Sequence, residues 1–101
     1  MEMEDIQRVY REHGLIVAGH AARRMKERHI LREEIVETIE HGEIIEAYLR
    51  EEPLPRYLIL KCICDGKPLH VLFGASETEL DLITAYRPDP MKWDDTFRYR
   101  R

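Results

Sequence analysis

The stretch RYLILKCICDGKPLHVLFG, residues 56–74, decides the fold of this chain. It holds two runs of strand-forming residues on either side of Asp65-Gly66. An Asp-Gly pair between apolar runs is a strong signal for a two-residue hairpin turn, because both turn positions require a positive φ. The stretch therefore predicts an antiparallel hairpin within a small sheet.

The turn also predicts which side chains share a face of the sheet. With Cys64 opposite Lys67, the apolar face that should meet the core holds Leu58, Leu60, Cys62, Leu69, Val71 and Phe73. The other face then receives Tyr57, Ile59, Lys61, His70 and Leu72. We expect a site on this second face, where Lys61 beside His70 would lower the pKa of the imidazole by repulsion.

The next strand, LDLITAY, should extend the same polar face. Pairing Gly74 with Leu80 would join it to the hairpin. This register places Thr84 beside His70, and Tyr86 one step away diagonally. A shift of one residue is the alternative, and it would turn the side chains of this strand to the opposite face.

Helical patterns fill the chain before the strands. Apolar spacing and strong helix formers predict helices over residues 4–13 and 20–29, and a third helix whose apolar stripe is Leu31, Ile35, Val36 and Ile39. Gly14 is placed to end the first helix, and Gly42 the third. Residues 15–17 form either a brief strand or an apolar anchor.

Four strands are predicted after the helices, over residues 43–49, 56–63, 69–73 and 80–86. This order defines an α+β class, in which N-terminal helices pack on one face of a small antiparallel four-stranded sheet. A length of 101 residues suits one compact domain that spans residues 1–101.

Charge is spread unevenly along the chain, whose formal net charge is −4. Residues 20–28 are basic, residues 33–52 carry eight glutamates against one arginine, and the tail from Arg87 to Arg101 is basic again. The net charge argues against a non-specific nucleic-acid binder. Whether the basic segments meet the acidic one depends on the fold.

Several protein classes are not expected. The N-terminus MEMEDIQRVYREHG carries acids where a signal peptide needs a positive region, and no apolar run is long enough to span a membrane. Cys62 and Cys64 are too close in a predicted strand for a usual disulfide, so we expect a cytoplasmic protein. Because these cysteines and His70 fall on opposite faces, we expect no metal and no other cofactor.

The segment GHAARRMKERHI, residues 19–30, concentrates positive charge. His20, Arg24 and Arg28 recur at intervals of four and line one side of the predicted helix. Arginines beside a histidine can hold a phosphate and move a proton. The alternative is a solvated basic face with its apolar back in the core. Trp93 also has two interpretations: its ring can stack on bases of a nucleic acid, or it can cap the open end of the core.

Six blocks of the chain, spread over residues 20–101, resemble the DUF4258 family of small bacterial and archaeal domains. They read HAARRMKERHI, EEIVETIEHGEII, PRYLIL, KPLHVLF, ITAYRPDPMKW and a terminal RR. The resemblance implies a fold similar to that of RelE-like and BrnT-like toxins, which are metal-independent ribonucleases of toxin–antitoxin modules. It also implies a partner, because members tend to be encoded beside a YgiT-type zinc-finger protein, as the MqsR toxin is beside its antitoxin.

We therefore expect an RNA-directed, metal-independent endoribonuclease of the toxin type. Its chemistry needs a base for the ribose 2′-hydroxyl, an acid for the leaving oxygen and cations for the phosphate. The expected catalytic residues are His70 and His20 as base and acid in either order, Arg24 and Arg28 as a phosphate clamp, and Tyr86 as proton donor or orienting group. The expected substrate-binding residues are Lys61, Arg87, Trp93, Arg100 and Arg101.

The alternative is a binding module without chemistry, whose acidic middle and polar sheet face dock a protein such as a zinc-finger antitoxin. RNA and this antitoxin are the expected partners, a membrane is not expected, and homodimer formation stays open. Geometry separates the two hypotheses. An enzyme should bring His20, Arg24 and His70 to one phosphate-sized point, whereas in a module they would point apart.

Overall fold

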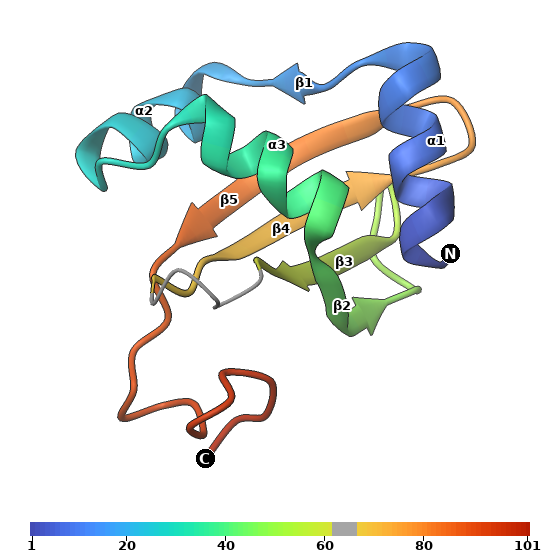
Figure 1. Ribbon diagram of the computed structural model, residues 1–101. Helices are drawn as coiled ribbons and strands as arrows, with labels where there is room; N and C mark the ends of the chain where they lie inside the picture. Colours follow the sequence, from blue (N-terminus) through green and yellow to red (C-terminus); the bar gives the residue numbers. More distant parts are fainter. Residues whose placement is uncertain (62–66) are drawn as a thin grey trace.

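A computed structural model describes residues 1–61 and 67–101 of the chain. Three helices and five strands follow one another within these two ranges (Figure 1). They are α1 (Met3–His13), β1 (Ile16–Val17), α2 (Gly19–Glu27), α3 (Arg32–His41), β2 (Glu43–Tyr48), β3 (Arg56–Leu60), β4 (His70–Ala75) and β5 (Leu80–Tyr86). The α+β class and the three predicted helices are thereby confirmed.

The sheet has five strands in the order β1-β5-β4-β3-β2. β2 to β5 pair antiparallel, as predicted, but β1 adds a parallel strand, in which Ile16 pairs with Asp81 and Val17 with Leu82. The prediction of a purely antiparallel four-stranded sheet is therefore wrong. The sequence allowed either a brief strand or an apolar anchor for residues 15–17. The backbone pairing of Ile16 and Val17 with β5 shows that they form a strand.

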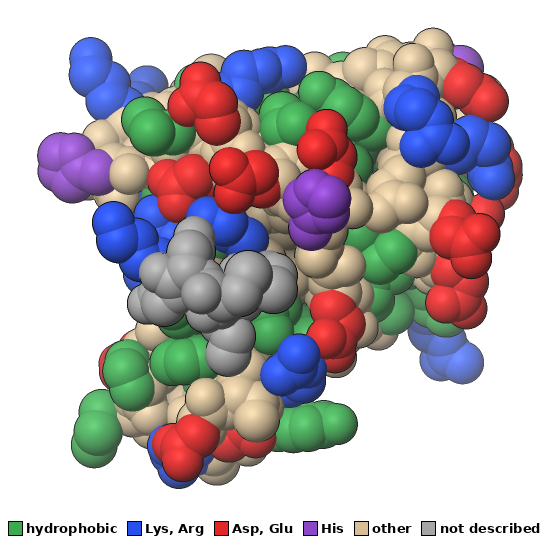
Figure 2. Space-filling view, in the orientation of Figure 1, with side chains coloured by type: hydrophobic (Ala, Val, Ile, Leu, Met, Phe, Trp, Pro, Cys, Tyr) green, Lys and Arg blue, Asp and Glu red, His purple; other side chains and the backbone are tan. Residues whose placement is uncertain are grey.

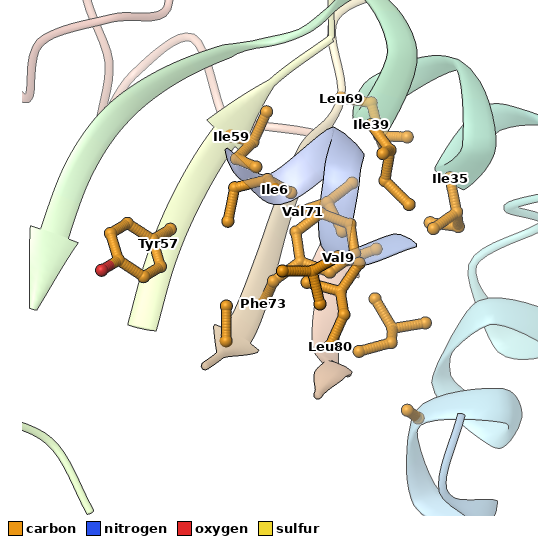
Figure 3. Packing of buried hydrophobic residues seen from close by; sticks show 14 of the residues in the cluster. Ile6, Val9, Ile35, Ile39, Tyr57, Ile59, Leu69, Val71, Phe73 and Leu80 are labelled. Carbon is orange, nitrogen blue, oxygen red and sulfur yellow. The ribbon is translucent and has the colours of Figure 1, made fainter. Parts of the chain in front are cut away.

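The main core lies between the helices and one face of the sheet (Figure 3). Ile6 and Val9 of α1 and Ile35 and Ile39 of α3 point down onto the strands and are fully buried. The sheet meets them with Tyr57, Ile59, Leu69, Val71, Phe73 and Leu80. Burial of these side chains is the largest favourable contribution to folding.

The hairpin register differs by one residue from the predicted one. Ile59 pairs with Val71, and Leu60 pairs with His70. Tyr57, Ile59 and Lys61 therefore share the helix-covered face with Leu69, Val71 and Phe73, while Leu58, Leu60, His70 and Leu72 take the other face. Apolar pattern could not decide the register, because β3 is buried on both faces. The predicted turn at Asp65-Gly66 and the positions of Cys62 and Cys64 lie outside the described residues.

The register of β5 also differs from the prediction. Leu80 pairs with Ala75 rather than with Gly74, and an irregularity follows between Leu72 and Phe73. Tyr86 therefore lies directly opposite His70, where Thr84 was expected. The shared face of His70 and Tyr86 was predicted and is confirmed by this pairing.

Gly42 is the tightest point between α3 and the sheet. A Cβ built on it would lie 2.6 Å from Ile59 Cγ2 and 3.0 Å from the carbonyl oxygen of Leu60, and closer still to the carbonyl oxygen of Thr38. Two of these three atoms belong to backbone and cannot rotate away. Gly42 is thus required for the close approach that leads α3 directly into β2.

We expect Gly42→Ala to lower the free energy of unfolding by about 2 kcal/mol or more, because the added methyl overlaps fixed atoms. Gly19→Ala is the matched control, since its Cβ would meet nothing within 4 Å at the start of α2. Urea unfolding of both variants measures the difference. Equal stability of Gly42→Ala and the wild type would contradict the prediction.

Candidate functional site

His70 lies at the start of β4 on the sheet face that the helices do not cover, and its side chain is fully buried. Its Nε2 is 2.9 Å from the carbonyl oxygen of Phe97, and its Nδ1 is 3.2 Å from the hydroxyl of Tyr86. A carbonyl oxygen only accepts, so Nε2 carries the proton and donates it to Phe97. Nδ1 then accepts the hydroxyl proton of Tyr86.

Trp93 and Arg100 of the C-terminal segment close over His70. The imidazole is nearly perpendicular to the indole ring of Trp93, with 4.4 Å between the ring centroids. Arg100 Cζ lies 4.6 Å from the centre of the same indole. Arg100 Nε and Nη2 each donate to Glu46 of β2 at 3.0 Å. A cation over an indole and a two-pronged ion pair together fix this segment on the sheet.

Burial sets the protonation of the two central groups. It lowers the pKa of His70, although the hydrogen bond to Phe97 acts in the opposite direction. It raises the pKa of Tyr86, which the positive charge of Arg100 offsets only in part. At neutral pH His70 is therefore uncharged, and Tyr86 keeps its hydroxyl proton.

A surface cavity of about 240 Å³ opens beside Tyr86 on this face of the sheet. We call it the sheet-face cavity. Its lining consists of Tyr48, Glu51, Arg56, Leu58, Leu72, Tyr86 and Arg100. Two leucines give it an apolar floor, and two guanidinium groups, two phenols and one carboxylate surround them.

The two arginines of the sheet-face cavity differ in their partners. Arg100 is held by Glu46, and the hydrogen bonds from Arg100 and Tyr48 lower the pKa of Glu46 despite its partial burial. Arg56 makes no ion pair or hydrogen bond through its side chain to any residue in the described part of the chain. Arg56 is therefore the cation of this cavity whose charge is not already compensated.

Tyr86, Trp93, Arg100 and His70 are the sequence-predicted site residues that the structure brings together. Tyr48, Glu51 and Arg56 of the cavity were missed. Arg56 pairs with Tyr48 across β2 and β3, on the face of Leu58 and Leu72. Strand alternation from the correct register would have found Arg56, but the predicted register placed that face under the helices.

The residues of α2 lie elsewhere. His20 and Arg24 are exposed, and in the described residues neither contacts His70, Tyr86 or the cavity. Arg28, just after α2, donates through Nη1 to the hydroxyl of Thr84 at 3.2 Å and to the carbonyl oxygen of Ala85 at 2.8 Å. The structure does not gather His20, Arg24 and His70 at one point. Because an enzyme was expected to bring them together, this arrangement counts against the expected active site and favours the binding module.

The remaining predicted binding residues are engaged in ion pairs. Lys61 was expected beside His70 but lies on the helix-covered face, with Nζ 3.7 Å from Glu34 and 3.4 Å from Glu37. Arg87 donates to Glu34 at 2.5 Å, and Arg101 to Asp95 at 3.0 Å. Figure 2 shows acidic side chains among basic ones on this helix-covered side of the molecule.

Within residues 1–61 and 67–101, no three His, Cys, Asp or Glu side chains gather where they could hold a metal ion. In the same ranges, no helix has the length and apolar character that crossing a membrane requires.

The chain matches the family described as a domain of unknown function (DUF4258) over residues 17–87, and it belongs to this family. α1 and the C-terminal segment with Trp93 and Arg100 lie outside the matched residues. No curated protein and no solved structure matches the chain. The expected likeness to RelE-like toxins therefore stays a prediction.

The buried imidazole should make stability depend on pH. Because the pKa of His70 is lowered on folding, the unfolded chain binds a proton first as the pH falls below about 6.5. We expect the free energy of unfolding of the wild type to decrease below that pH more steeply than that of His70→Gln. Urea unfolding at a series of pH values measures both slopes.

His41→Gln is the control, because His41 is exposed on α3 and faces solvent. It should follow the wild-type profile. Parallel profiles of the wild type and His70→Gln would show that the imidazole titrates alike in the folded and unfolded chains.

Proposed function

We propose that the protein is a metal-independent endoribonuclease of the toxin type, and that the sheet-face cavity is its reaction site. The observation that carries the proposal is the grouping of Arg56, Arg100, Tyr48, Tyr86 and Glu51 around an apolar floor. These groups include a cation without a partner, phenols that keep their protons, and a carboxylate. RNA as the substrate, and a reaction that needs no metal ion, are what the resemblance to RelE-like and BrnT-like toxins implies.

The reaction would proceed by attack of the ribose 2′-oxygen on the neighbouring phosphorus. The new bond closes a 2′,3′-cyclic phosphate, the bond to the 5′-oxygen breaks, and the electron pair leaves with that oxygen. Glu51 takes the proton of the 2′-hydroxyl. Tyr86 gives its hydroxyl proton to the leaving oxygen, and its hydrogen bond to His70 Nδ1 has to break for this step. Arg56 stabilises the charge that develops on the phosphate oxygens.

His70 acts in this proposal as a positioning residue. Its full burial under Trp93 keeps it from touching a substrate, so the earlier expectation of His70 as base or acid is revised. Its Nδ1 instead fixes the hydroxyl of Tyr86. Arg100 supports the same cavity through the ion pair with Glu46.

A binding module without chemistry is the second candidate. It is favoured by the separation of His20 and Arg24 from His70. It is also favoured because the expected catalytic residue His70 is enclosed and the expected binding residue Arg100 is neutralised by Glu46. The YgiT-type zinc-finger antitoxin stays the predicted protein partner in both cases, and homodimer formation stays open.

We expect purified protein to cleave single-stranded RNA in the presence of EDTA and to leave cyclic phosphate ends. Tyr86→Phe and Arg56→Ala should each lower the rate by about a hundredfold or more, because each removes a group that acts at the transition state. Gel analysis of end-labelled RNA measures the rates, and urea unfolding checks that both variants are folded.

Arg11→Ala is the matched control for Arg56→Ala, because Arg11 is an exposed arginine at the end of α1. It should cleave at the wild-type rate. A folded wild type that leaves RNA intact would reject the nuclease and favour the binding module.

A further inference from the structure

The exposed face of α2 carries a cluster of positive side chains that have no partner in the described residues. Arg23, Arg24 and Lys26 are exposed, and His20 lies one turn before the two arginines. In residues 1–61 and 67–101, none of these four side chains makes a hydrogen bond or an ion pair. Glu27 is the single acidic residue of the helix.

Several other cations of the described residues, although not Arg56, are paired with carboxylates by the fold. Each of the following forms an ion pair with a carboxylate: Arg8, Lys61, Arg87, Arg98, Arg100 and Arg101. A chain with a net charge of −4 has enough acids to neutralise α2 as well. The unpaired cations of α2 are therefore available to a partner outside the chain.

We propose that the exposed face of α2 binds the phosphate backbone of RNA, at a site separate from the sheet-face cavity. That RNA is the polyanion rests on the proposed function. The helix is joined to the cavity along β5: Arg28 at its end binds Thr84 and Ala85, and the next residue, Tyr86, lines the cavity. RNA held on α2 can therefore continue to the reaction site along the end of this strand.

The chemistry of the face suits phosphates. Guanidinium groups donate two parallel hydrogen bonds to a phosphate, and successive positions along a helix can serve successive phosphates of a flexible strand. An acidic protein could also be attracted to such charge. The continuity with the cavity favours RNA, because the proposed reaction needs a polymer held beyond the cleaved bond.

The test uses the full chain and a fluorescein-labelled, single-stranded RNA with 2′-O-methyl groups, which cannot be cleaved through the 2′-oxygen. Anisotropy titrations at a series of KCl concentrations give the dependence of affinity on salt. Each phosphate contact on a single strand contributes about 0.7 to the slope of log affinity against log salt. Arg23→Ala/Arg24→Ala/Lys26→Ala should therefore lower the slope by about 2, and the affinity at about 0.1 M salt by roughly a hundredfold.

Arg24→Ala and Arg11→Ala form the matched pair of single variants. The first should lower the slope by about 0.7, and the second should leave it unchanged. Thermal unfolding should show little difference, since an exposed side chain without an ion pair contributes little to stability.

The outcomes separate this proposal from the proposed function. An unchanged salt slope in the triple variant would overturn RNA binding by α2, even if the wild type cleaves RNA. Loss of slope in a chain that cleaves nothing would support α2 as an RNA site and reject the nuclease. Tighter binding of poly-glutamate than of RNA, lost in the triple variant, would assign the face to an acidic protein and overturn the proposal.

Discussion

The structure depends on one constraint: the central strands β3 and β4 are apolar on both faces and have to be covered on both. α1 and α3 cover one face with Ile6, Val9, Ile35 and Ile39. No helix of residues 1–61 and 67–101 covers the other face, and the C-terminal segment takes that place. Trp93 packs against His70 there, while Leu58 and Leu60 are also buried.

The same constraint explains the uneven charge along the sequence. The segment after β5 has few apolar residues, so it is held to β2 by ion pairs, Arg98 with Glu43 and Arg100 with Glu46. The bound arginines lower the pKa of both glutamates, which keeps the pairs charged at neutral pH. Glutamates of the acidic middle therefore neutralise Lys61 and three arginines of the tail, Arg87, Arg98 and Arg100, but not the cations of α2.

Periodicity was enough to predict the helices and the four longer strands, because helical and strand spacing differ plainly in this chain. It was not enough for the register of the hairpin, because a strand buried on both faces looks the same after a shift of one residue. The observed hairpin register takes Lys61 away from His70. The register of β5, which also differs from the prediction, places Tyr86 directly opposite His70. The cavity depends on this register and on the path of the tail, and neither Arg56 nor Glu51 could be found without them.

The cavity and the buried contact of His70 with Trp93 both depend on the C-terminal segment, so a substitution in this segment can change stability and site together. Arg100 lies over Trp93, binds Glu46 and lines the cavity, so its removal would disturb fold and site together. Arg56 has no partner in the described residues and lies at the start of β3, where its backbone is held by pairing with Tyr48 and Gly74. Its backbone position depends on the sheet, whereas its charge is not used by the fold. A cation that the fold does not need, kept at the wall of a cavity, is best explained by a ligand that carries negative charge.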